Sequence, residues 1–503
     1  MTTENHLIDR LRAASLGRDD ATFARLPGGG TRSYGDLFAR SAQVAGALQA
    51  LGVQPGDRVA AQIPKSLRAI ELYLGTVMAG GVFLPLNTGY TPAEVEYFLS
   101  DAEPRVFVCD PAKAAALAPV AAKCGAPALL TLGAEGEGTL DDAAAAADPA
   151  PLVPRGAEDL AAILYTSGTT GRSKGAMLSH RALASNSQML VDAWRFTEAD
   201  VLIHALPIFH THGLFVATNV TLLAGGSCIF LPGFDADAIL AALPSATALM
   251  GVPTFYTRLL ARPELTRDLC ANMRLFISGS APLLAETHRE WEARTGHRIL
   301  ERYGMTETNM NTSNPYDRER RAGTVGFPLP GVELRVMLDG KEVPRGEIGV
   351  LEVRGDNVFS GYWRMPEKTA EELRPDGWFI TGDLGRVDED GYVHIVGRGK
   401  DLIISGGFNV YPKEVEELID DLPGVLESAV IGLPHPDFGE GVAAVVVRSG
   451  ETTEDAIRAA VAEKLAKFKQ PKRYWFVDAL PRNTMGKVQK AQMRADYADA
   501  FTG

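Results

Sequence analysis

Short apolar runs alternate with helix-like stretches over residues 160–310, and this alternation constrains the fold more than any other feature of the chain. The apolar runs read VLIHALP, CIFLP, TALMGVP and LFISGS, and each precedes a segment of helical character. One such segment, 282–296, places Leu284, His288 and Trp291 on one face and ends at Gly296. Strands that alternate with helices form sheets with helices packed on their faces. The sequence therefore predicts an α/β fold.

Two later regions change character. Residues 325–400 contain the strand-like runs VELRVML, IGVLEVRG and GYVHIVGR, separated by Gly- and Asp-rich turns, which predict a small β subdomain. After residue 400, helices predicted at 412–421 and 453–468 surround the strands SAVIG and GVAAVVVR, a compact α+β unit. The alanine-rich segment 141–150 is expected to be a surface connector. We therefore expect layered α/β sheets and a small β subdomain, followed by a smaller α+β domain.

Composition excludes several classes of protein. The net charge of -13 over 503 residues disfavours a nucleic-acid partner, because phosphate backbones are bound by clustered Lys and Arg. No run approaches the ~18–20 apolar residues that span a bilayer, and the polar N-terminus lacks the apolar core of a signal peptide. The four cysteines lie far apart and are expected to be reduced thiols. We expect a cytoplasmic protein with no membrane partner.

The segment Tyr165–Gly175, YTSGTTGRSKG, has the composition of a phosphate-binding loop. Its glycines let the backbone approach an anion closely, and its five hydroxyls and one lysine are donors for phosphate oxygens. It is not the loop of P-loop NTPases, because no Ser or Thr follows a Gly-Lys pair. A surface turn is the alternative, but a turn between a strand and a helix capped by Ser179 seldom needs so many donors. The predicted phosphate ligands are Thr166, Ser167, Gly168, Thr169, Thr170, Gly171 and Lys174.

Further segments follow this loop in a recognisable order: GSAP (279–282), ERYGMTE (301–307), TGDLG, GRGKD and PRNTMGKVQK. With them the chain resembles, over nearly its whole length, the adenylate-forming superfamily of acyl-CoA synthetases, firefly-type luciferases and peptide-synthetase adenylation domains. The resemblance implies an N-terminal adenylation domain, about 1–399, and a mobile C-terminal domain, about 400–503. It also implies a hinge at Lys400.

The same resemblance implies ATP, Mg²⁺ and coenzyme A as substrates or cofactors. Tyr303 would stack on adenine, Asp383 would bind the ribose hydroxyls, and Arg398 would lie close to the same ribose. Glu307 and Thr166 are the implied magnesium ligands. The remaining implied nucleotide contacts are Gly279, Ser280, Ala281, Pro282, Glu301, Arg302, Gly304, Met305 and Thr306.

The implied chemistry is the attack of a carboxylate on the α-phosphorus of ATP, which brings two anions together. The catalytic lysine, Lys487, and the magnesium ion would offset the developing negative charge. Glu307, Thr166 and His210 complete the implied catalytic set. The segment SGGFNVYP would then line the path of coenzyme A through Ser405, Gly406, Gly407 and Phe408. A lysine acetyltransferase is a candidate partner, because acetylation would remove the charge of Lys487.

Two arginines, Arg258 and Arg302, lie in the segments that form the acyl pocket of this family. A buried arginine needs a partner, and a second carboxylate on the substrate would supply one with bidentate geometry. The residues therefore favour a short dicarboxylic acid. The alternative is that Arg302 pairs with Glu301 or Glu307 and that Arg258 lies on a helix surface.

The stretches HALPIFHTHGLFVATNV, GVPTFYTRLL and ERYGMTETNMNTSNPY resemble those of malonyl-CoA synthetases. This resemblance implies malonate as substrate, methylmalonate as a slower one, and His210 as a pocket-side histidine. A synthetase for another short, medium-chain or aryl acid is the nearest rival. A domain that loads a carrier protein and a non-catalytic nucleotide sensor are more distant ones; the second would be expected to lack Lys487, Glu307 or Asp383.

Overall fold

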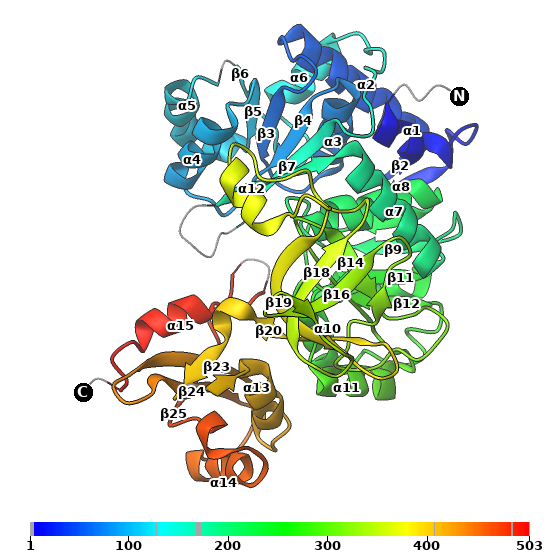
Figure 1. The fold of residues 1–503 in the computed structure, drawn as a ribbon. Helices are drawn as coiled ribbons and strands as arrows, with labels where there is room; N and C mark the ends of the chain where they lie inside the picture. The colour runs from blue at the N-terminus through cyan, green and yellow to red at the C-terminus, as the bar shows by residue number, and fades with distance from the viewer. Residues whose placement is uncertain (1–4, 127, 167–172, 407, 484–485, 502–503) are drawn as a thin grey trace.

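The computed structural model describes residues 5–126, 128–166, 173–406, 408–483 and 486–501. The predicted phosphate ligands Ser167, Gly168, Thr169, Thr170 and Gly171 and the predicted coenzyme A contact Gly407 lie outside these residues. Figure 1 shows a large N-terminal body and a smaller C-terminal body beside it, coloured orange to red. Within the described residues the strands form four sheets, three in the large body and one in the small body. The predicted division into a large α/β domain and a smaller α+β domain is confirmed.

The first sheet of the large body has six strands in the order β6-β5-β3-β4-β7-β8. All neighbours are parallel except β7 and β8, which form an antiparallel hairpin around the predicted phosphate loop. Sequence analysis missed β8, the strand between the loop and the helix that follows. The bounds are β3 Arg58–Gln62, β4 Val82–Pro85, β5 Val106–Cys109, β6 Ala128–Thr131, β7 Leu160–Thr166 and β8 Lys174–Ser179.

The second sheet has nine strands in the order β15-β14-β13-β12-β11-β9-β10-β1-β2. Strands β10, β9, β11, β12 and β13 are parallel neighbours, so their carboxyl ends lie at one edge of the sheet. Their bounds are β9 Val201–His204, β10 Ser227–Phe230, β11 Ala248–Gly251, β12 Leu275–Ser278 and β13 Leu300–Met305. The outer strands are β1 Thr22–Arg25, β2 Thr31–Ser33, β14 Asn309–Ser313 and β15 Phe327–Pro328.

The small β subdomain is an antiparallel sheet in the order β17-β16-β18-β19-β20, as the turns predicted. Its strands are β16 Glu333–Leu338, β17 Lys341–Glu342, β18 Gly349–Arg354, β19 Phe379–Val387 and β20 Val393–Arg398. The next strand along the chain belongs to the C-terminal sheet, ordered β22-β21-β24-β23 with β25 paired to β24. Those strands are β21 Ile403–Ser405, β22 Phe408–Val410, β23 Val425–His435, β24 Gly439–Arg448 and β25 Arg473–Val477.

Helices cover the sheets, and several of them begin at a side-chain cap. Ser179 caps α7 by accepting a hydrogen bond from the Ala182 amide at 3.1 Å, and Gly296 ends α11 with φ 80°, both as predicted. The N-terminal helices are α1 His6–Ala13, α2 Tyr34–Ala50, α3 Leu67–Met78, α4 Pro92–Ala102, α5 Ala114–Lys123, α6 Thr139–Ala146 and α7 His180–Trp194. The π-helix η2 His212–Thr218 runs into α8 Asn219–Ala224. The others are α9 Ala236–Ala242, α10 Pro253–Leu260, α11 Ala285–Thr295, α12 Pro366–Glu372, α13 Pro412–Asp420, α14 Glu454–Lys464 and α15 Lys490–Asp496.

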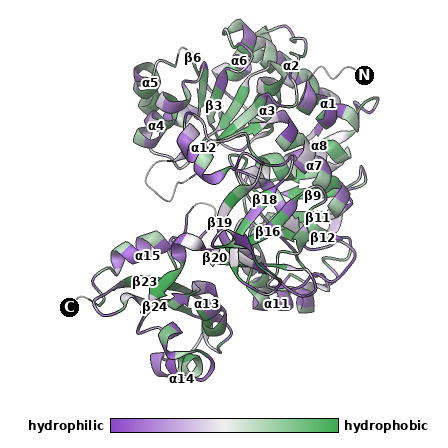
Figure 2. Cartoon of the chain, viewed as in Figure 1, coloured by the Kyte–Doolittle hydropathy of each residue, from purple (hydrophilic) through white to green (hydrophobic). Residues whose placement is uncertain are grey.

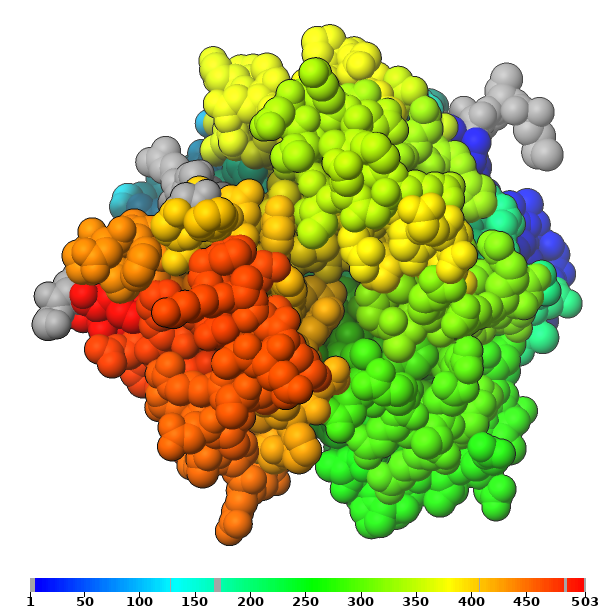
Figure 3. All heavy atoms as spheres, turned by 60° about the horizontal axis from the view of Figure 1, so that its bottom comes forward, coloured from blue at the N-terminus to red at the C-terminus, as the bar shows by residue number. Residues whose placement is uncertain are grey.

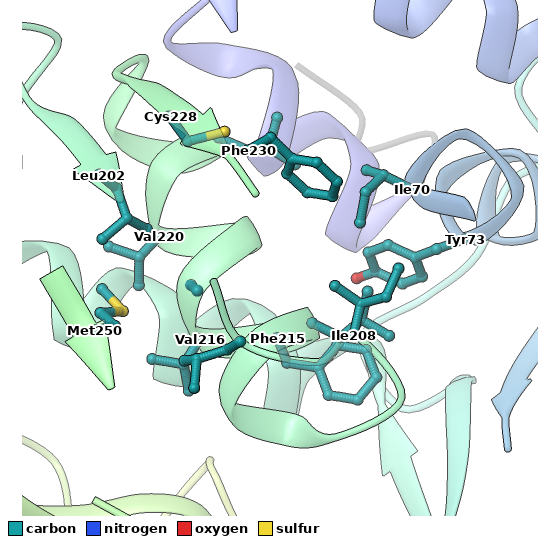
Figure 4. Close-up of a cluster of buried hydrophobic side chains, with 14 of the residues drawn as sticks. Ile70, Tyr73, Leu202, Ile208, Phe215, Val216, Val220, Cys228, Phe230 and Met250 are labelled. Atoms are coloured by element: carbon teal, nitrogen blue, oxygen red, sulfur yellow. The ribbon is translucent and has the colours of Figure 1, made fainter. Parts of the chain in front are cut away.

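One hydrophobic core joins the two large sheets through helices α3, α7 and α8. Figure 2 shows hydrophobic residues concentrated on the central strands of both sheets. In the close-up of Figure 4, Ile70 and Tyr73 of α3 face Phe230 at the end of β10 and Phe215 of η2. This packing sets the carboxyl ends of β3 and β9 against each other, and the candidate site is built at that junction.

Two sequence predictions about helices were wrong in detail. Residues 139–146 form helix α6 instead of a connector, because Leu140 and Ala144 are buried against the core. The helix predicted at 453–468 ends at Lys464, where the backbone of Leu465 becomes extended. Leu465 and Phe468 still pack on the C-terminal core, so the apolar spacing reflected burial and not helical continuity.

Removal of the buried charge of Glu71 should destabilise the large domain. Its carboxylate is fully buried and lies 2.8 Å from Arg68, 3.7 Å from Arg32 and 4.0 Å from Arg40. Glu71→Gln should lower the free energy of unfolding by about 2–4 kcal/mol, because it removes the shared counter-charge. Urea unfolding followed by tryptophan fluorescence measures this loss.

The control is Glu198→Gln, which removes an ion pair with Arg18. The Glu198 side chain is 66% exposed. Its expected cost is below about 1 kcal/mol. Equal destabilisation by the two substitutions would contradict a special role for burial at Glu71.

Candidate functional site

The phosphate region is bounded by the paired ends of β7 and β8, Thr166 and Lys174. The Lys174 ammonium lies 3.1 and 3.2 Å from the two carboxylate oxygens of Glu372 on α12. It also donates to the Tyr362 hydroxyl at 3.1 Å and lies 4.2 Å from the centre of the Tyr362 ring. The lysine expected to meet phosphate therefore already has an anionic partner in the protein.

Tyr362 connects this lysine to Glu307. The Tyr362 hydroxyl lies 3.0 Å from Glu307 Oε1 and 2.5 Å from Glu372 Oε2. Glu307 is buried, and burial raises its pKa, while the bond from Tyr362 and the charge of Lys174 oppose that shift. Sequence analysis missed Tyr362 and Glu372; no motif pointed to them, because their role depends on the position of α12 against β8.

The candidate nucleotide region lies where β13 of the nine-stranded sheet meets the β19–β20 hairpin. Asp383 and Arg398 are direct cross-strand neighbours, and Arg398 Nε lies 2.7 Å from Asp383 Oδ1. The Tyr303 hydroxyl donates to Asp383 Oδ2 at 2.5 Å. The structure thus brings together three residues that were predicted from three separate motifs.

The segment 279–282 follows β12 and borders the same region. Ser280 has φ 70°, a left-handed conformation that costs free energy for a residue with a side chain, and its Oγ lies 3.3 Å from His212 Nδ1. A Cβ added to Gly279 would lie only 2.4 Å from Arg302 Cζ. Glycine is therefore required at position 279 for Arg302 to occupy its place.

The basic pocket is defined here as His210 and His212, from the segment after β9, and Arg302, from the middle of β13. Arg302 is 3% exposed, and its Nε and Nη2 have no hydrogen-bond partner within the described residues. His210 Nδ1 and His212 Nε2 are unpartnered in the same way. Burial lowers the pKa of Arg302 to about 9, so it stays charged near pH 7. Burial and the charge of Arg302 lower the pKa of His210 to about 4, so that ring is neutral.

Lys487 reaches the site from the C-terminal body. Its charge contributes to the lowered pKa of His210, and the charges of Arg398 and Asp383 act on it in turn. Although the residue as a whole is exposed, protein atoms crowd its ammonium group. This desolvation lowers the pKa of Lys487 to about 8, helped by Arg398 and opposed by Asp383. The Lys487 amide donates to Asn483 Oδ1 at 2.9 Å, which shapes the turn that carries it.

Arg258 does not join the basic pocket. It lies on the exposed face of α10, with its guanidinium 5.4 Å from the centre of the Phe234 ring. Among the described residues, no ion pair joins Arg302 to Glu301 or Glu307. The expectation of two buried arginines is thus corrected to one, because the helical turn after Tyr256 directs Arg258 to solvent while Tyr256 stays buried.

Other predicted residues lie at the boundary between the two bodies. Glu301 is buried and accepts a bond from the Leu283 amide at 3.2 Å. Burial raises its pKa to about 7, and the charge of Lys413 on α13 opposes the rise. Ser405 is buried in β21, whereas Gly406 and Phe408 are exposed. Phe408 stacks on Phe468 at 4.8 Å within the C-terminal body. Figure 3 shows a furrow between the two bodies beside this region.

Comparison with known proteins assigns the family. The sequence profile of the AMP-binding enzyme family matches residues 11–363, and that of the AMP-binding enzyme C-terminal domain matches residues 414–487. The chain belongs to the AMP-binding enzymes.

Three relatives place this AMP-binding enzyme more closely. It is 63% identical to MatB from Rhodopseudomonas palustris, whose ATP-bound crystal structure superposes with a TM-score of 0.96 over 99% of both chains. It is 39% identical to a feruloyl-CoA synthase of Amycolatopsis sp, over 93% of this chain and 95% of the relative. It is 36% identical to a malonate–CoA ligase of Arabidopsis thaliana, over 89% of this chain and 79% of the relative.

The arrangement of the two bodies is nearer to that of the nucleotide-bound relative. The apo crystal structure of MatB from R. palustris has the same 63% identity and 99% coverage, but a TM-score of 0.86. Since the two structures have the same sequence identity to this chain, the difference lies in how the chain is arranged. The AMP-binding enzyme described here, with Lys487 beside Asp383 and Arg398, has the arrangement of the ATP-bound form. No helix within the described ranges is both long and apolar enough to cross a membrane.

Asp383→Asn should weaken AMP binding at least about tenfold, because the variant removes the negative charge that faces Arg398 and accepts from Tyr303. Titration calorimetry with AMP measures the change in Kd. The matched control is Asp388→Asn on the same hairpin, whose carboxylate pairs with His394 at 2.9 Å outside this region. The control should keep the AMP Kd within about twofold, and a similar loss in both variants would contradict the placement of the nucleotide.

Proposed function

We propose that this enzyme is an ATP- and coenzyme A-dependent ligase that forms malonyl-CoA from malonate through a malonyl-AMP intermediate, and acts more slowly on methylmalonate. The observation that carries the proposal is Arg302, a buried and charged guanidinium that has no ion pair within the described residues. The similarity to a malonate–CoA ligase supports the same substrate.

The basic pocket is suited to the distal carboxylate of a short diacid. A guanidinium binds a carboxylate through two parallel hydrogen bonds, and the free Nε and Nη2 of Arg302 are adjacent donors of that kind. His210 is neutral and adds hydrogen-bonding capacity without a second charge. A monocarboxylate would leave Arg302 unpaired in the interior, which costs several kcal/mol and opposes its use. An aryl acid such as that named for the feruloyl relative would place an apolar ring against this charge.

The residues present fit a magnesium ion that bridges protein and phosphate. Mg²⁺ is usually held by one or two carboxylates together with substrate phosphates and water. Glu307 offers a buried carboxylate at the phosphate region, and the described residues contain no group of three or more His, Cys, Asp or Glu side chains that could hold a metal ion by themselves. Glu307 and Thr166 would hold the ion. When bound, it would offset negative charge on the phosphates.

Lys487 would serve the first half-reaction. The proximal carboxylate of malonate attacks the α-phosphorus of ATP, pyrophosphate leaves, and Lys487 offsets the negative charge that develops on the reacting oxygens. In the second half-reaction the thiolate of coenzyme A attacks the carbonyl carbon of malonyl-AMP, and AMP leaves. Asp383, Arg398 and Tyr303 would hold the nucleotide through both steps.

We also propose that the domains divide at 399/400 and that Lys400 is the hinge. Strand β20 ends at Arg398 in one sheet, and β21 begins at Ile403 in another, so the connection crosses between the bodies. Rotation there would withdraw Lys487 and bring in the β21–β22 turn with Ser405, Gly406, Gly407 and Phe408 for coenzyme A. A lysine acetyltransferase would act on Lys487 after this rotation, because in the present arrangement protein atoms crowd the ammonium group.

The substrate is tested with short mono- and dicarboxylates, assayed for coenzyme A-dependent AMP formation. Malonate should be the best substrate, and Arg302→Met should lower kcat/KM for malonate at least about a hundredfold, the ~3 kcal/mol of a lost charged contact, with the KM for ATP unchanged. Arg258→Met is the matched control, because that arginine is exposed on α10, and it should keep wild-type activity. Equal use of acetate and malonate by the wild type would exclude the proposed diacid site.

Lys487→Ala should separate the two half-reactions. Pyrophosphate release that depends on malonate should fall by at least about a hundredfold, because the charge that offsets the reacting oxygens is gone. Formation of malonyl-CoA from supplied malonyl-AMP should stay within about threefold of the wild type. Lys487→Gln, which imitates the acetylated side chain, should behave in the same way. Equal loss in both half-reactions would refute this division of roles.

A further inference from the structure

Lys65 is a buried lysine that takes no part in the proposed reaction. It follows β3 in the six-stranded sheet, and its ammonium crosses to the end of β9 in the nine-stranded sheet. Lys65 Nζ lies 3.0 Å from His204 Nδ1, 2.7 Å from the His204 carbonyl oxygen and 4.5 Å from the centre of the Phe230 ring. No carboxylate of the described residues forms an ion pair with it. Burial lowers the pKa of Lys65. The charged amine is therefore destabilised by the loss of water, and no counter-charge beside it offsets that loss.

The partners of His204 fix which of its nitrogens carries the proton. The Gly213 carbonyl oxygen beside Nε2 can only accept, so the ring proton lies on Nε2, and Nδ1 accepts from the Lys65 amine. His204 Nε2 then donates to the Gly213 carbonyl oxygen at 3.0 Å, and it also lies 3.1 Å from Thr218 Oγ1. His204 is 2% exposed, and burial, followed by the charge of Lys65, lowers its pKa, so the ring is neutral.

The Gly213 carbonyl belongs to the π-helix η2, which begins at His212 in the basic pocket. Thr218 Oγ1 donates to the same oxygen at 3.0 Å, and the Leu214 amide donates to the His210 carbonyl oxygen at 3.0 Å. A Cβ at Gly213 would lie 2.0 Å from the Pro207 carbonyl oxygen, so the backbone is tightly packed at this point. π-Helical turns are uncommon and are found disproportionately at functional sites.

The helix α3 supports the same segment from the other side. Tyr73 of α3 donates to Asn219 Oδ1 at 3.3 Å, at the junction of η2 and α8. Figure 4 shows Tyr73 beside Phe215 of η2, and Phe230 near Ile70. Polar contacts from several elements therefore hold η2 and its junction with α8, and the one through Lys65 and His204 reaches the Gly213 carbonyl oxygen, next to His212 in the first turn of η2.

We propose that Lys65 is a positioning residue for the diacid: it orients His204, which fixes the first turn of η2 and thereby the places of His210 and His212 beside Arg302. The proposal rests on the proposed function, because its effect is on recognition of the distal carboxylate. Lys65 acts through His204 and not by contact with the substrate. It is thus a determinant of specificity that lies in a different sheet from the pocket it serves.

The test is steady-state kinetics of the full-length Lys65→Met variant with malonate and with acetate. The KM for malonate should rise at least about tenfold and the preference for malonate over acetate should fall by a similar factor, while the KM for ATP stays within about twofold. The matched control is Lys113→Met, which removes another partly buried lysine whose amine donates to a main-chain carbonyl, that of Thr88. The control should leave all three quantities at wild-type values.

His204→Asn keeps the proposal testable if Lys65→Met does not fold. Asparagine offers its carbonyl oxygen to Lys65, but its shorter side chain does not carry the amide nitrogen as far as His204 Nε2, so the bond to the Gly213 carbonyl is lost and the KM for malonate should rise as in Lys65→Met. A folded variant of either kind with a wild-type KM for malonate would overturn the role of Lys65, as would an equal rise in the KM for ATP. Turnover of malonate by the wild-type enzyme is measured separately. If the wild type did not turn over malonate, both the proposed function and this inference would be overturned.

Discussion

The organisation of this enzyme depends on a buried guanidinium that the protein itself does not neutralise. Arg302 lies in the middle of β13 at 3% exposure, in the space left by the missing side chain of Gly279. Such a charge is costly in a folded interior unless a partner arrives with its own negative charge. The cost is repaid when an anionic group binds, so affinity for that group is built into the free protein. The neighbouring histidines stay neutral because burial, followed by the same charge, lowers their pKa values.

A second constraint couples the two parts of the phosphate region. Lys174 and Glu307 come from different segments, and Tyr362 contacts both at 3.1 and 3.0 Å. Glu372 closes the arrangement from α12 by contacting Lys174 and the Tyr362 hydroxyl. The cation for phosphate and the carboxylate for metal are thus held at a defined separation before any nucleotide binds. Preorganisation of this kind reduces the rearrangement required when charge develops in the reaction.

The two bodies contribute to one site only in a particular arrangement. Tyr303, Asp383 and Arg398 are assembled within the large body by β13 and the β19–β20 hairpin. Lys487 reaches them from a turn in the small body, and the short connection between β20 and β21 joins the two. The higher TM-score with ATP-bound MatB than with its apo form agrees with this proximity.

The sequence by itself determined the alternation of strands and helices, the cap at Ser179, the end of α11 at Gly296 and the order of the family motifs. These follow from local rules, since periodicity, capping and glycine placement act over a few residues. Only the tertiary structure decided that Arg302 is buried while Arg258 faces solvent, because the turn of α10 and the gap at Gly279 lie far apart in the chain. The contacts of Glu372 and Tyr362 could not be predicted either, since they depend on the position of α12 against β8. The contact of Lys65 depends on the packing of the two large sheets. Local sequence sets the elements, and the long-range packing of those elements sets which charges meet.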